Sequence, residues 1–191
     1  MSVLKAGGRM KTPARQGSPN DFQTPAYAIK PLLPYIPKDW VVWECASGKG
    51  NLVKEFIRQG YITLYSDIAI SPELNFMEYE PVTYCEAVDT ILPIHYDVIV
   101  TNPPYSLKQQ FLERAYSLHK PFAFLLPLTT FETKKRQELF KKYGLEVIFF
   151  DKRINFETPS GKGSSSWFAT AWFTNGLNIG RQMTFEELKE E

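Results

Sequence analysis

The stretch Tyr96-Asp97-Val98-Ile99-Val100-Thr101-Asn102-Pro103-Pro104-Tyr105 joins an apolar run to a polar, proline-rich turn. The continuous apolar character of residues 98–100 predicts a central parallel strand that is covered on both faces. The two prolines remove two backbone donors and fix φ, so the segment after Thr101 should project rigidly from the edge of a sheet. We therefore expect an α/β fold with this turn at the carboxyl end of a buried strand.

Segments on both sides of residues 96–105 alternate between strand and helix patterns. Strands are predicted at 41–45, 61–66, 122–128, 145–150 and 167–173, and helices at 51–59, from Ser106 onward and at 133–143. A short or kinked helix is expected after Thr24-Pro25, with Thr24 as its N-cap. This alternation predicts a doubly wound, mostly parallel sheet with helices on both faces. Ligands of such sheets bind outside the carboxyl ends of the strands.

A glycine turn follows the first predicted strand, in the segment Glu44-Cys45-Ala46-Ser47-Gly48-Lys49-Gly50. Glycines allow backbone amides to approach a ligand closely. Asp67 closes the next strand, where an acidic side chain can bind both hydroxyls of a ribose. A glycine turn alone is more often a tight connection, but together with Asp67 it favours an adenosine-containing cofactor. The turn lacks the third glycine of the dinucleotide fingerprint, and Lys49 is not placed as in a phosphate loop, so NAD and ATP are disfavoured.

The turn Asn102-Pro103-Pro104-Tyr105 predicts a site for an amino group. The Asn102 side-chain carbonyl and the backbone carbonyls of Asn102 and Pro103 form a set of acceptors for an –NH₂ group. Tyr105 offers a flat face on which a base can stack. The alternative is a proline turn capped by an asparagine.

These segments, together with Asp21-Phe22-Gln23-Thr24-Pro25, resemble the DNA N6-adenine methyltransferases, in particular the small phage and prophage enzymes. The resemblance covers nearly the whole chain from residue 21. It implies a seven-stranded sheet whose last strand is antiparallel, S-adenosylmethionine as cofactor, and catalysis by Asn102, Pro103, Pro104 and Tyr105. The cofactor contacts that it implies are Phe22, Thr24, Pro25, Glu44, Ala46, Gly48, Gly50, Asp67, Asn75 and Phe76. Asn75-Phe76-Met77 stands where the family often has Asp-Phe-Leu, and Asp89 is a rival for contact with the cofactor adenine.

Basic residues suggest where nucleic acid is bound. The formal net charge is only +1, so a basic surface must be local. Lys134, Lys135 and Arg136 start a helix after the fifth strand and are predicted to contact phosphates. Lys162, in the glycine- and serine-rich loop 160–166, is predicted to act in a loop that closes over the substrate. The alternatives are a solvated helix face and a plain hairpin connection.

The chain is expected to divide into a flexible basic arm (1–20), a methyltransferase domain (21–183) and an acidic tail (184–191). Cys45 and Cys85 form no cluster with histidine, so no metal site and no disulfide framework are expected. The N-terminus lacks the apolar core of a signal peptide, and no apolar run approaches the length of a membrane span. These features favour a cytoplasmic protein.

The sequence therefore predicts transfer of a methyl group from S-adenosylmethionine to N6 of adenine in DNA. Neither the stretch between Asp67 and Asn102 nor the residues after Phe173 are long enough for a target-recognition domain, so sequence specificity should be short or loose. Two alternatives stay open: an RNA adenine or guanine amino-methyltransferase, and a catalytically silent nucleic-acid-binding module of the same fold. The Asn-Pro-Pro-Tyr motif indicates the reaction and leaves the substrate open, and the oligomeric state is not readable.

Overall fold

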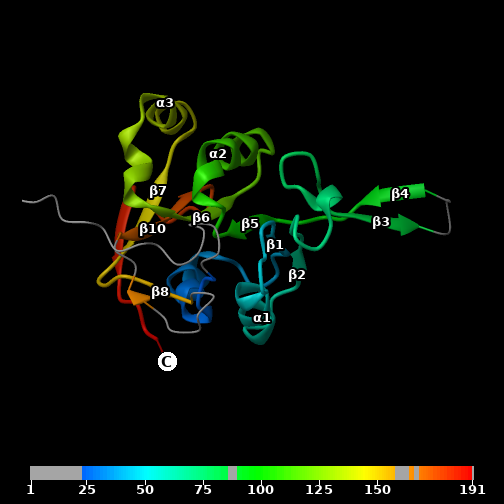
Figure 1. Ribbon diagram of the computed structural model, residues 1–191, viewed down its shortest axis with the longest axis horizontal. Coiled ribbons are helices and arrows are strands. Elements are labelled where there is room, and N and C mark those ends of the chain that lie inside the picture. Colours follow the sequence, from blue (N-terminus) through cyan, green and yellow to red (C-terminus); the bar gives the residue numbers. More distant parts are fainter. Residues whose placement is uncertain (1–22, 86–89, 158–163, 166–167, 191) are drawn as a thin grey trace, which may run out of the picture.

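The computed structural model describes residues 23–85, 90–157, 164–165 and 168–190, and its centre is a seven-stranded sheet (Figure 1). The strand order is β11-β7-β10-β6-β5-β1-β2. These strands are β1 (Val42–Glu44), β2 (Thr63–Tyr65), β5 (Val98–Thr101), β6 (Phe122–Pro127), β7 (Glu146–Phe150), β10 (Thr170–Asn175) and β11 (Met183–Glu186).

The sheet is mostly parallel, as predicted. Strand β1 pairs in parallel with β2 and β5, β5 with β6, and β7 with β11. Strand β10 lies between β6 and β7 and is antiparallel to both, which supplies the late antiparallel strand that was expected. The edge strand β11 follows it in the chain. The predicted fold class is confirmed.

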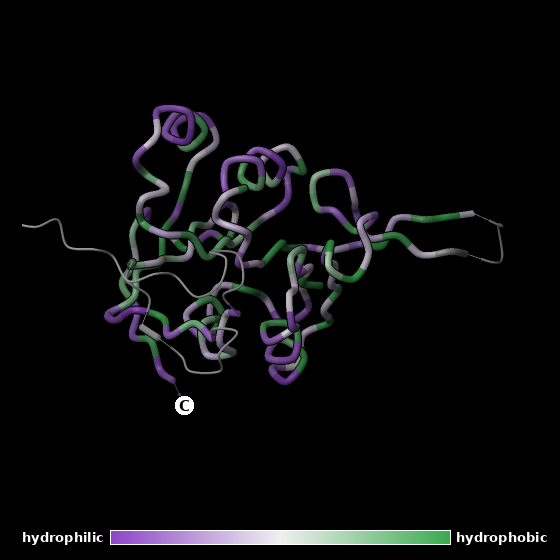
Figure 2. The backbone as a smooth tube through the Cα atoms, viewed as in Figure 1, coloured by the Kyte–Doolittle hydropathy of each residue, from purple (hydrophilic) through white to green (hydrophobic). Residues whose placement is uncertain are grey.

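Helices cover both faces of the sheet (Figures 1 and 2), and the sheet separates two hydrophobic clusters, one on each face. One face carries the 3₁₀ segment η1 (Ala26–Tyr35) and α1 (Asn51–Arg58), and the other carries α2 (Lys108–Ser117) and α3 (Lys134–Tyr143). Pro31 and Pro34 lie inside η1 and interrupt an α-helical ladder, because proline has no backbone N–H and its ring crowds the preceding turn. Thr24 does not cap this helix, which starts one residue later than predicted, after Pro25.

Tryptophan side chains join the helices to the sheet. Trp43 and Trp172 are fully buried, one in each cluster. A buried indole needs a partner for its N–H. Trp172 Nε1 donates to the Ala28 carbonyl at 2.8 Å, and Trp43 Nε1 donates to Ser66 Oγ at 3.0 Å. The first of these bonds fixes η1 against the sheet, and the second fixes the end of β2 against β1.

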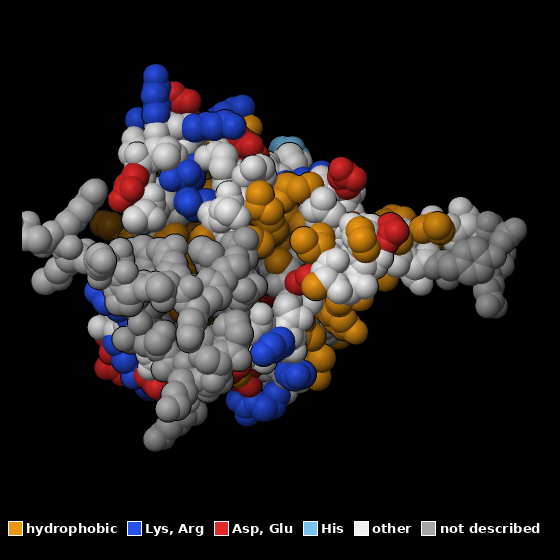
Figure 3. Space-filling model, in the orientation of Figure 1, with side chains coloured by type: hydrophobic (Ala, Val, Ile, Leu, Met, Phe, Trp, Pro, Cys, Tyr) orange, Lys and Arg blue, Asp and Glu red, His pale blue; other side chains and the backbone are white. Residues whose placement is uncertain are grey.

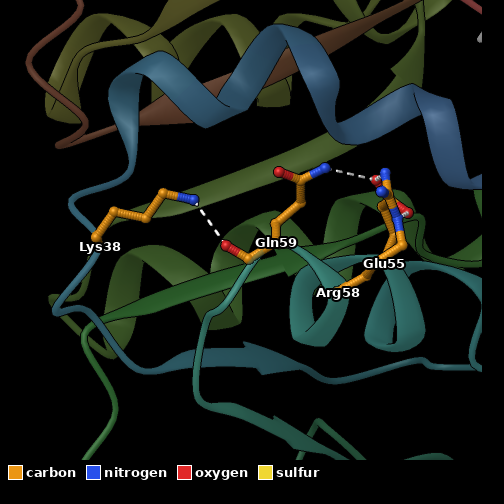
Figure 4. A network of polar contacts seen from close by, with 4 residues as sticks. All are labelled: Lys38, Glu55, Arg58 and Gln59. Carbon is orange, nitrogen blue, oxygen red and sulfur yellow. Dashed lines mark hydrogen bonds and ion pairs between the residues drawn. The ribbon is translucent and has the colours of Figure 1, made fainter.

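Polar contacts fasten the end of α1 to the loop after η1 (Figure 4). The Glu55 carboxylate accepts from Arg58 at 2.6 and 2.8 Å and from Gln59 Nε2 at 3.0 Å. Lys38 Nζ donates to the Gln59 carbonyl at 2.9 Å, which satisfies one of the open carbonyls at the helix end. This end of α1 is therefore held from two sides.

A hairpin outside the main sheet was not predicted. Strands β3 (Val82–Cys85) and β4 (Thr90–Pro93) pair antiparallel and extend beyond the β2 side of the molecule (Figure 1). A second small pairing joins β8 (Asn155–Phe156) to β9 (Ser164–Ser165). The described residues also include the 3₁₀ turns η2 (Pro72–Leu74), η4 (Tyr105–Leu107) and η5 (Leu128–Glu132).

The carboxyl-terminal segment differs from the acidic tail expected at 184–191. Residues 183–186 form β11, whose register pairs Thr184 with Ile148 and Phe185 with Phe149. Leu188 is buried, and its backbone N–H donates to Asp151 at 2.9 Å. Hydrophobic residues between the glutamates explain the difference, because they pack against β7 and the core. The predicted arm at 1–20 lies outside the described residues. Among the residues that the structure describes, no helix is long and apolar enough to cross a membrane.

Candidate active site at the carboxyl ends of β1 and β5

A cavity of about 540 Å³ opens where β1, β2 and β5 end. Four segments that lie far apart in the sequence line it: Gln23-Thr24 before η1, the glycine turn after β1, the turn after β2, and the Asn102–Tyr105 turn after β5. Of the predicted residues, the lining includes Thr24, Glu44, Ala46, Gly48, Asp67, Asn102, Pro103, Pro104 and Tyr105. The parallel strands bring these groups to one sheet edge, as the strand pattern required.

The Asp67 carboxylate holds the glycine turn in place. Asp67 Oδ2 accepts from the Gly48 N–H and Oδ1 accepts from the Ala69 N–H, each at 2.7 Å. Gly48 has a φ of 51° and Gly50 a φ of 76°, a region that side chains with a Cβ rarely adopt. A Cβ on Gly48 would also lie 2.6 Å from Gln23 Oε1. The glycines thus permit both the sharp turn and the close approach of Gln23.

Glu44 places an unpaired carboxyl group in the floor of the cavity. Its side chain is 1% exposed, and neither oxygen has a hydrogen-bond partner of normal geometry among the described residues. Burial raises the pKa of Glu44 to about 8, while the nearby Thr101 hydroxyl and Ala46 amide oppose this rise. Near neutral pH the carboxyl is therefore largely protonated. A cationic group entering the cavity would favour the charged form.

The end of β5 and the turn after it also contain buried oxygen atoms that can accept hydrogen bonds. Asn102 Oδ1 and Thr101 Oγ1 are buried without a hydrogen-bond partner of normal geometry among the described residues. The Tyr105 hydroxyl is likewise buried, and burial raises the pKa of Tyr105. Lys108 Nζ donates to the Tyr105 carbonyl at 3.0 Å, which anchors the end of the turn. An unpaired buried acceptor is costly, so Asn102 Oδ1 is poised for a donor that arrives with a ligand.

Tyr105 packs against an aromatic side chain from the region before β10. Its ring stands edge-on to Phe168, with centroids 5.6 Å apart and an interplanar angle of 83°. This contact fixes the Tyr105 ring, which lines the cavity. The stacking of a base on Tyr105 stays a prediction.

Several predicted cofactor residues lie away from the cavity lining. Phe76 is buried in the core, 4.8 Å from Phe111 and 5.4 Å from Trp43 between ring centroids, and does not line the cavity, so its contact with the cofactor stays a prediction. Asn75 accepts from the Met77 N–H at 3.2 Å and stabilises its own turn. Pro25 is buried before η1, and Gly50 precedes α1 without lining the cavity. Phe22 and Asp89 lie outside the described residues.

The predicted phosphate-binding residues have different environments in the structure. Arg136 is 8% exposed, and its Nε donates to the Thr130 carbonyl at 2.6 Å. The Arg136 guanidinium thus fixes the turn that follows β6, and its contact with a phosphate stays a prediction. Lys134 is exposed and lies 3.8 Å from Glu138, whereas Lys135 forms an ion pair with Glu113 at 2.7 Å. Lys162 lies outside the described residues.

Sequence reasoning missed part of the lining, namely Gln23, Ser47, Lys49, Asn51, Leu52, Ile68, Ala69 and Leu107. Gln23 is the most informative of these, because its Oε1 accepts from the Lys49 N–H at 2.9 Å. Its backbone also pairs with Glu157 through two hydrogen bonds of 3.0 Å. Its position inside the quoted segment 21–25 was the available signal. Among the described residues, no group of His, Cys, Asp or Glu side chains is arranged to hold a metal ion.

Comparison with solved structures supports the fold assignment. A candidate class I S-adenosylmethionine-dependent methyltransferase from Listeria monocytogenes aligns with a TM-score of 0.56 at 12% identity, over 92% of this chain and 68% of the other. A candidate RNA methyltransferase from Pyrococcus horikoshii aligns with a TM-score of 0.51 at 11% identity, over 84% of this chain and 88% of the other. No family model and no curated protein matches the sequence. At these identities the likeness establishes a shared class I methyltransferase fold.

The buried Glu44 predicts an unusual pH dependence of stability. A carboxyl with a raised folded-state pKa contributes most below its unfolded value of 4.5, and that contribution declines as the pH rises toward 8. The free energy of unfolding should fall by up to about 4 kcal/mol over this window. Denaturant unfolding of Glu44→Gln should show no such fall.

Glu55→Gln is the matched control, because Glu55 is also buried but Arg58 and Gln59 lower its pKa. Its substitution should lower stability by a similar amount at every pH between 5 and 8. Parallel pH profiles for the wild type and Glu44→Gln would contradict the assignment of a protonated Glu44.

Proposed function

We propose that this protein transfers a methyl group from S-adenosylmethionine to an exocyclic amino nitrogen, and that this nitrogen is N6 of adenine in DNA. One observation carries the proposal: the unpaired Asn102 Oδ1 and the unpaired Glu44 carboxyl share a cavity with the glycine turn and Asp67. The class I methyltransferase fold of the structural neighbours supports the cofactor.

The residues present fit this cofactor. The Glu44 oxygens lack partners and would bind an ammonium group, such as that of a methionine moiety, with loss of the carboxyl proton. Asp67 retains lone pairs beyond those used by Gly48 and Ala69, and ribose hydroxyls can donate to them. The volume of about 540 Å³ falls in the usual range for small-molecule sites. When bound, the cofactor supplies an electrophilic methyl group on a positively charged sulfur.

Asn102 would act on the amino group that accepts the methyl. Its Oδ1 and the neighbouring backbone carbonyls accept the amino hydrogens, which directs the nitrogen lone pair toward the methyl carbon. The N–C bond forms as the C–S bond breaks, and the nitrogen then loses one proton to water. Acceptors that bind the developing positive charge more tightly than the neutral amine lower the barrier.

The choice of adenine in DNA rests on the resemblance of residues along the chain, from the segment 21–25 through Asn102–Tyr105. Duplex DNA and RNA of matched sequence, incubated with cofactor labelled on the methyl group and then digested to nucleosides, test this choice. Label on N6-methyldeoxyadenosine is the expected result. Label confined to RNA nucleosides would redirect the proposal to the RNA alternative, and no label in either would favour a silent binding module.

Asn102→Ala should lower kcat by on the order of a hundredfold or more, because the lost hydrogen bond strengthens as the nitrogen becomes tetrahedral. Cofactor affinity should change little. Asn175→Ala is the matched control, since the Asn175 amide donates to Tyr143 and Gly144, away from the cavity. Near-normal turnover in Asn102→Ala would refute the amino-methyltransferase mechanism.

Asp67→Asn should weaken cofactor binding by roughly tenfold to a hundredfold in calorimetry, because a charged acceptor is lost. Asp97→Asn is the control, since the Asp97 carboxylate also accepts from a backbone amide, that of Val41 at 2.7 Å, and does not line the cavity. Unchanged affinity in Asp67→Asn would remove Asp67 from the ribose site.

The double variant Lys134→Ala with Lys135→Ala should weaken binding to DNA equally across sequences. The slope of the logarithm of the binding constant against the logarithm of the salt concentration should become less steep by about two, one for each lost phosphate contact. Lys141→Ala with Lys142→Ala, at the far end of α3, provides the charge-matched control. If both double variants give the wild-type salt slope, this helix is a solvated face without a role in binding.

A further inference from the structure

The molecule has an exposed hydrophobic arm and an exposed hydrophobic sheet edge on the same side (Figures 1 and 3). On the hairpin, Ile91 is 65% exposed and Val82 44%. At the edge, Ile62 is 67% exposed and Tyr65 59%. An isolated two-stranded hairpin is only marginally stable in water, and large exposed apolar patches mark interaction surfaces.

The hairpin has one consistently apolar face. Its register pairs Val82 with Pro93 and Tyr84 with Ile91, and successive residues on a strand alternate between faces. Val82, Ile91 and Pro93 therefore share a face of the hairpin, opposite the face that holds Thr83, Thr90 and Leu92. The arm is thus a ready-made strand pair with an apolar side.

Strand β2 has backbone groups available for pairing. It ends the strand order of the main sheet, so within the described part of the chain no strand pairs with its outer edge. The Val42 N–H donates to the Ile62 carbonyl and the Ser66 N–H to the Glu44 carbonyl, both at 2.9 Å, so residues 62 and 66 point their backbone groups toward β1. The alternation of a parallel ladder turns the amides of Thr63 and Tyr65 outward.

The charge pattern argues against nucleic acid as the binding partner of the hairpin and the β2 edge. The segment from Gln59 to Leu107 contains no lysine and no arginine, whereas it carries seven acidic residues. A phosphate backbone is bound through cations, which this segment does not provide. Exposed edges are also usually protected by charged side chains, and the β2 segment 61–66 has none.

The opposite edge of the sheet differs in this respect. Strand β11 also exposes Phe185, at 76%, but Arg181, Glu186 and Glu187 flank or belong to it. Phe185 stacks on Phe149 of its own sheet, with ring centroids 5.3 Å apart. Charges and this internal contact make β11 a protected edge, and β2 the unprotected one.

We propose that the hairpin of one copy lies along the β2 edge of a second copy, and reciprocally, so that the protein is a twofold-symmetric dimer. Each molecule carries both halves of the contact, which is what an isologous interface requires. The described segments 81–85, 90–94 and 61–70 together supply about twenty residues, within the range of roughly 20 to 30 that a standard interface uses on each side. This proposal is independent of the chemistry proposed for the cavity.

Sedimentation velocity of the full chain over a dilution series tests the proposal. The wild type is expected at twice the chain mass of 22.0 kDa. Ile91→Glu on the arm and Tyr65→Pro on the edge should each weaken dimerisation by about tenfold or more, because one buries a carboxylate and the other removes an outward N–H. Circular dichroism should show that both variants retain the wild-type fold.

Phe185→Glu is the matched control, with the same charge placed on the opposite edge strand; it should remain dimeric. A monomeric wild type would overturn the proposal, as would a dimer that only Phe185→Glu dissociates. Dissociation by Ile91→Glu without any effect of Tyr65→Pro would exclude β2 as the acceptor. Loss of DNA retention by Ile91→Glu at unchanged mass would assign the arm to nucleic acid instead.

Discussion

The two hydrogen bonds from the Gly48 and Ala69 amides to Asp67 are the interactions on which the site depends. The bond from Gly48 joins the turn after β1 to the turn after β2, and the bond from Ala69 fixes Asp67 within its own turn. Gln23 adds a further link to the glycine turn through the Lys49 amide. Backbone amides that would otherwise lack partners are satisfied in this way, so the turn keeps its left-handed glycines in a single conformation. The carboxyl ends of β1 and β2 thus form one rigid wall of the cavity.

The neighbouring carboxyl ends of β1 and β5 carry polar atoms whose hydrogen-bond capacity is unused. Glu44, Thr101 and Asn102 all bring buried oxygens without a partner of normal geometry to adjacent strand ends. Each such atom costs folding free energy, and that cost is tolerated where a ligand supplies the missing donors. The raised pKa of Glu44 has the same origin, because burial penalises its charged form until a cation is present. The chemistry and the local instability of this site therefore have one cause.

Lysine and arginine residues are unevenly distributed along the chain, so that one region of the molecule carries cations and another carries none. All 22 lysines and arginines lie outside residues 59–107, so any contact with phosphates belongs to the remaining segments. Within those segments the cations are not equivalent. Arg136 is committed to the Thr129 and Thr130 carbonyls, whereas Lys134 remains exposed at the start of α3. The cation-free region instead presents apolar side chains on the hairpin and on the β2 edge.

Local sequence patterns determined the alternation of strands and helices, the doubly wound sheet and the meeting of Glu44, Gly48, Asp67 and Asn102 at one edge. These follow from hydrophobic periodicity and from the rule that parallel strands share a carboxyl edge. Tertiary structure alone decided which of the remaining residues reach the cavity. Phe76 was drawn into an aromatic cluster, Arg136 into backbone carbonyls, and residues 183–186 into the sheet, because burial and hydrogen bonding depend on neighbours distant in sequence. The hairpin at 82–93 was not predicted, because among the described strands β3 and β4 pair with each other and lie outside the main sheet. The hydrophobic periodicity that predicted the other strands comes from burial in the main sheet.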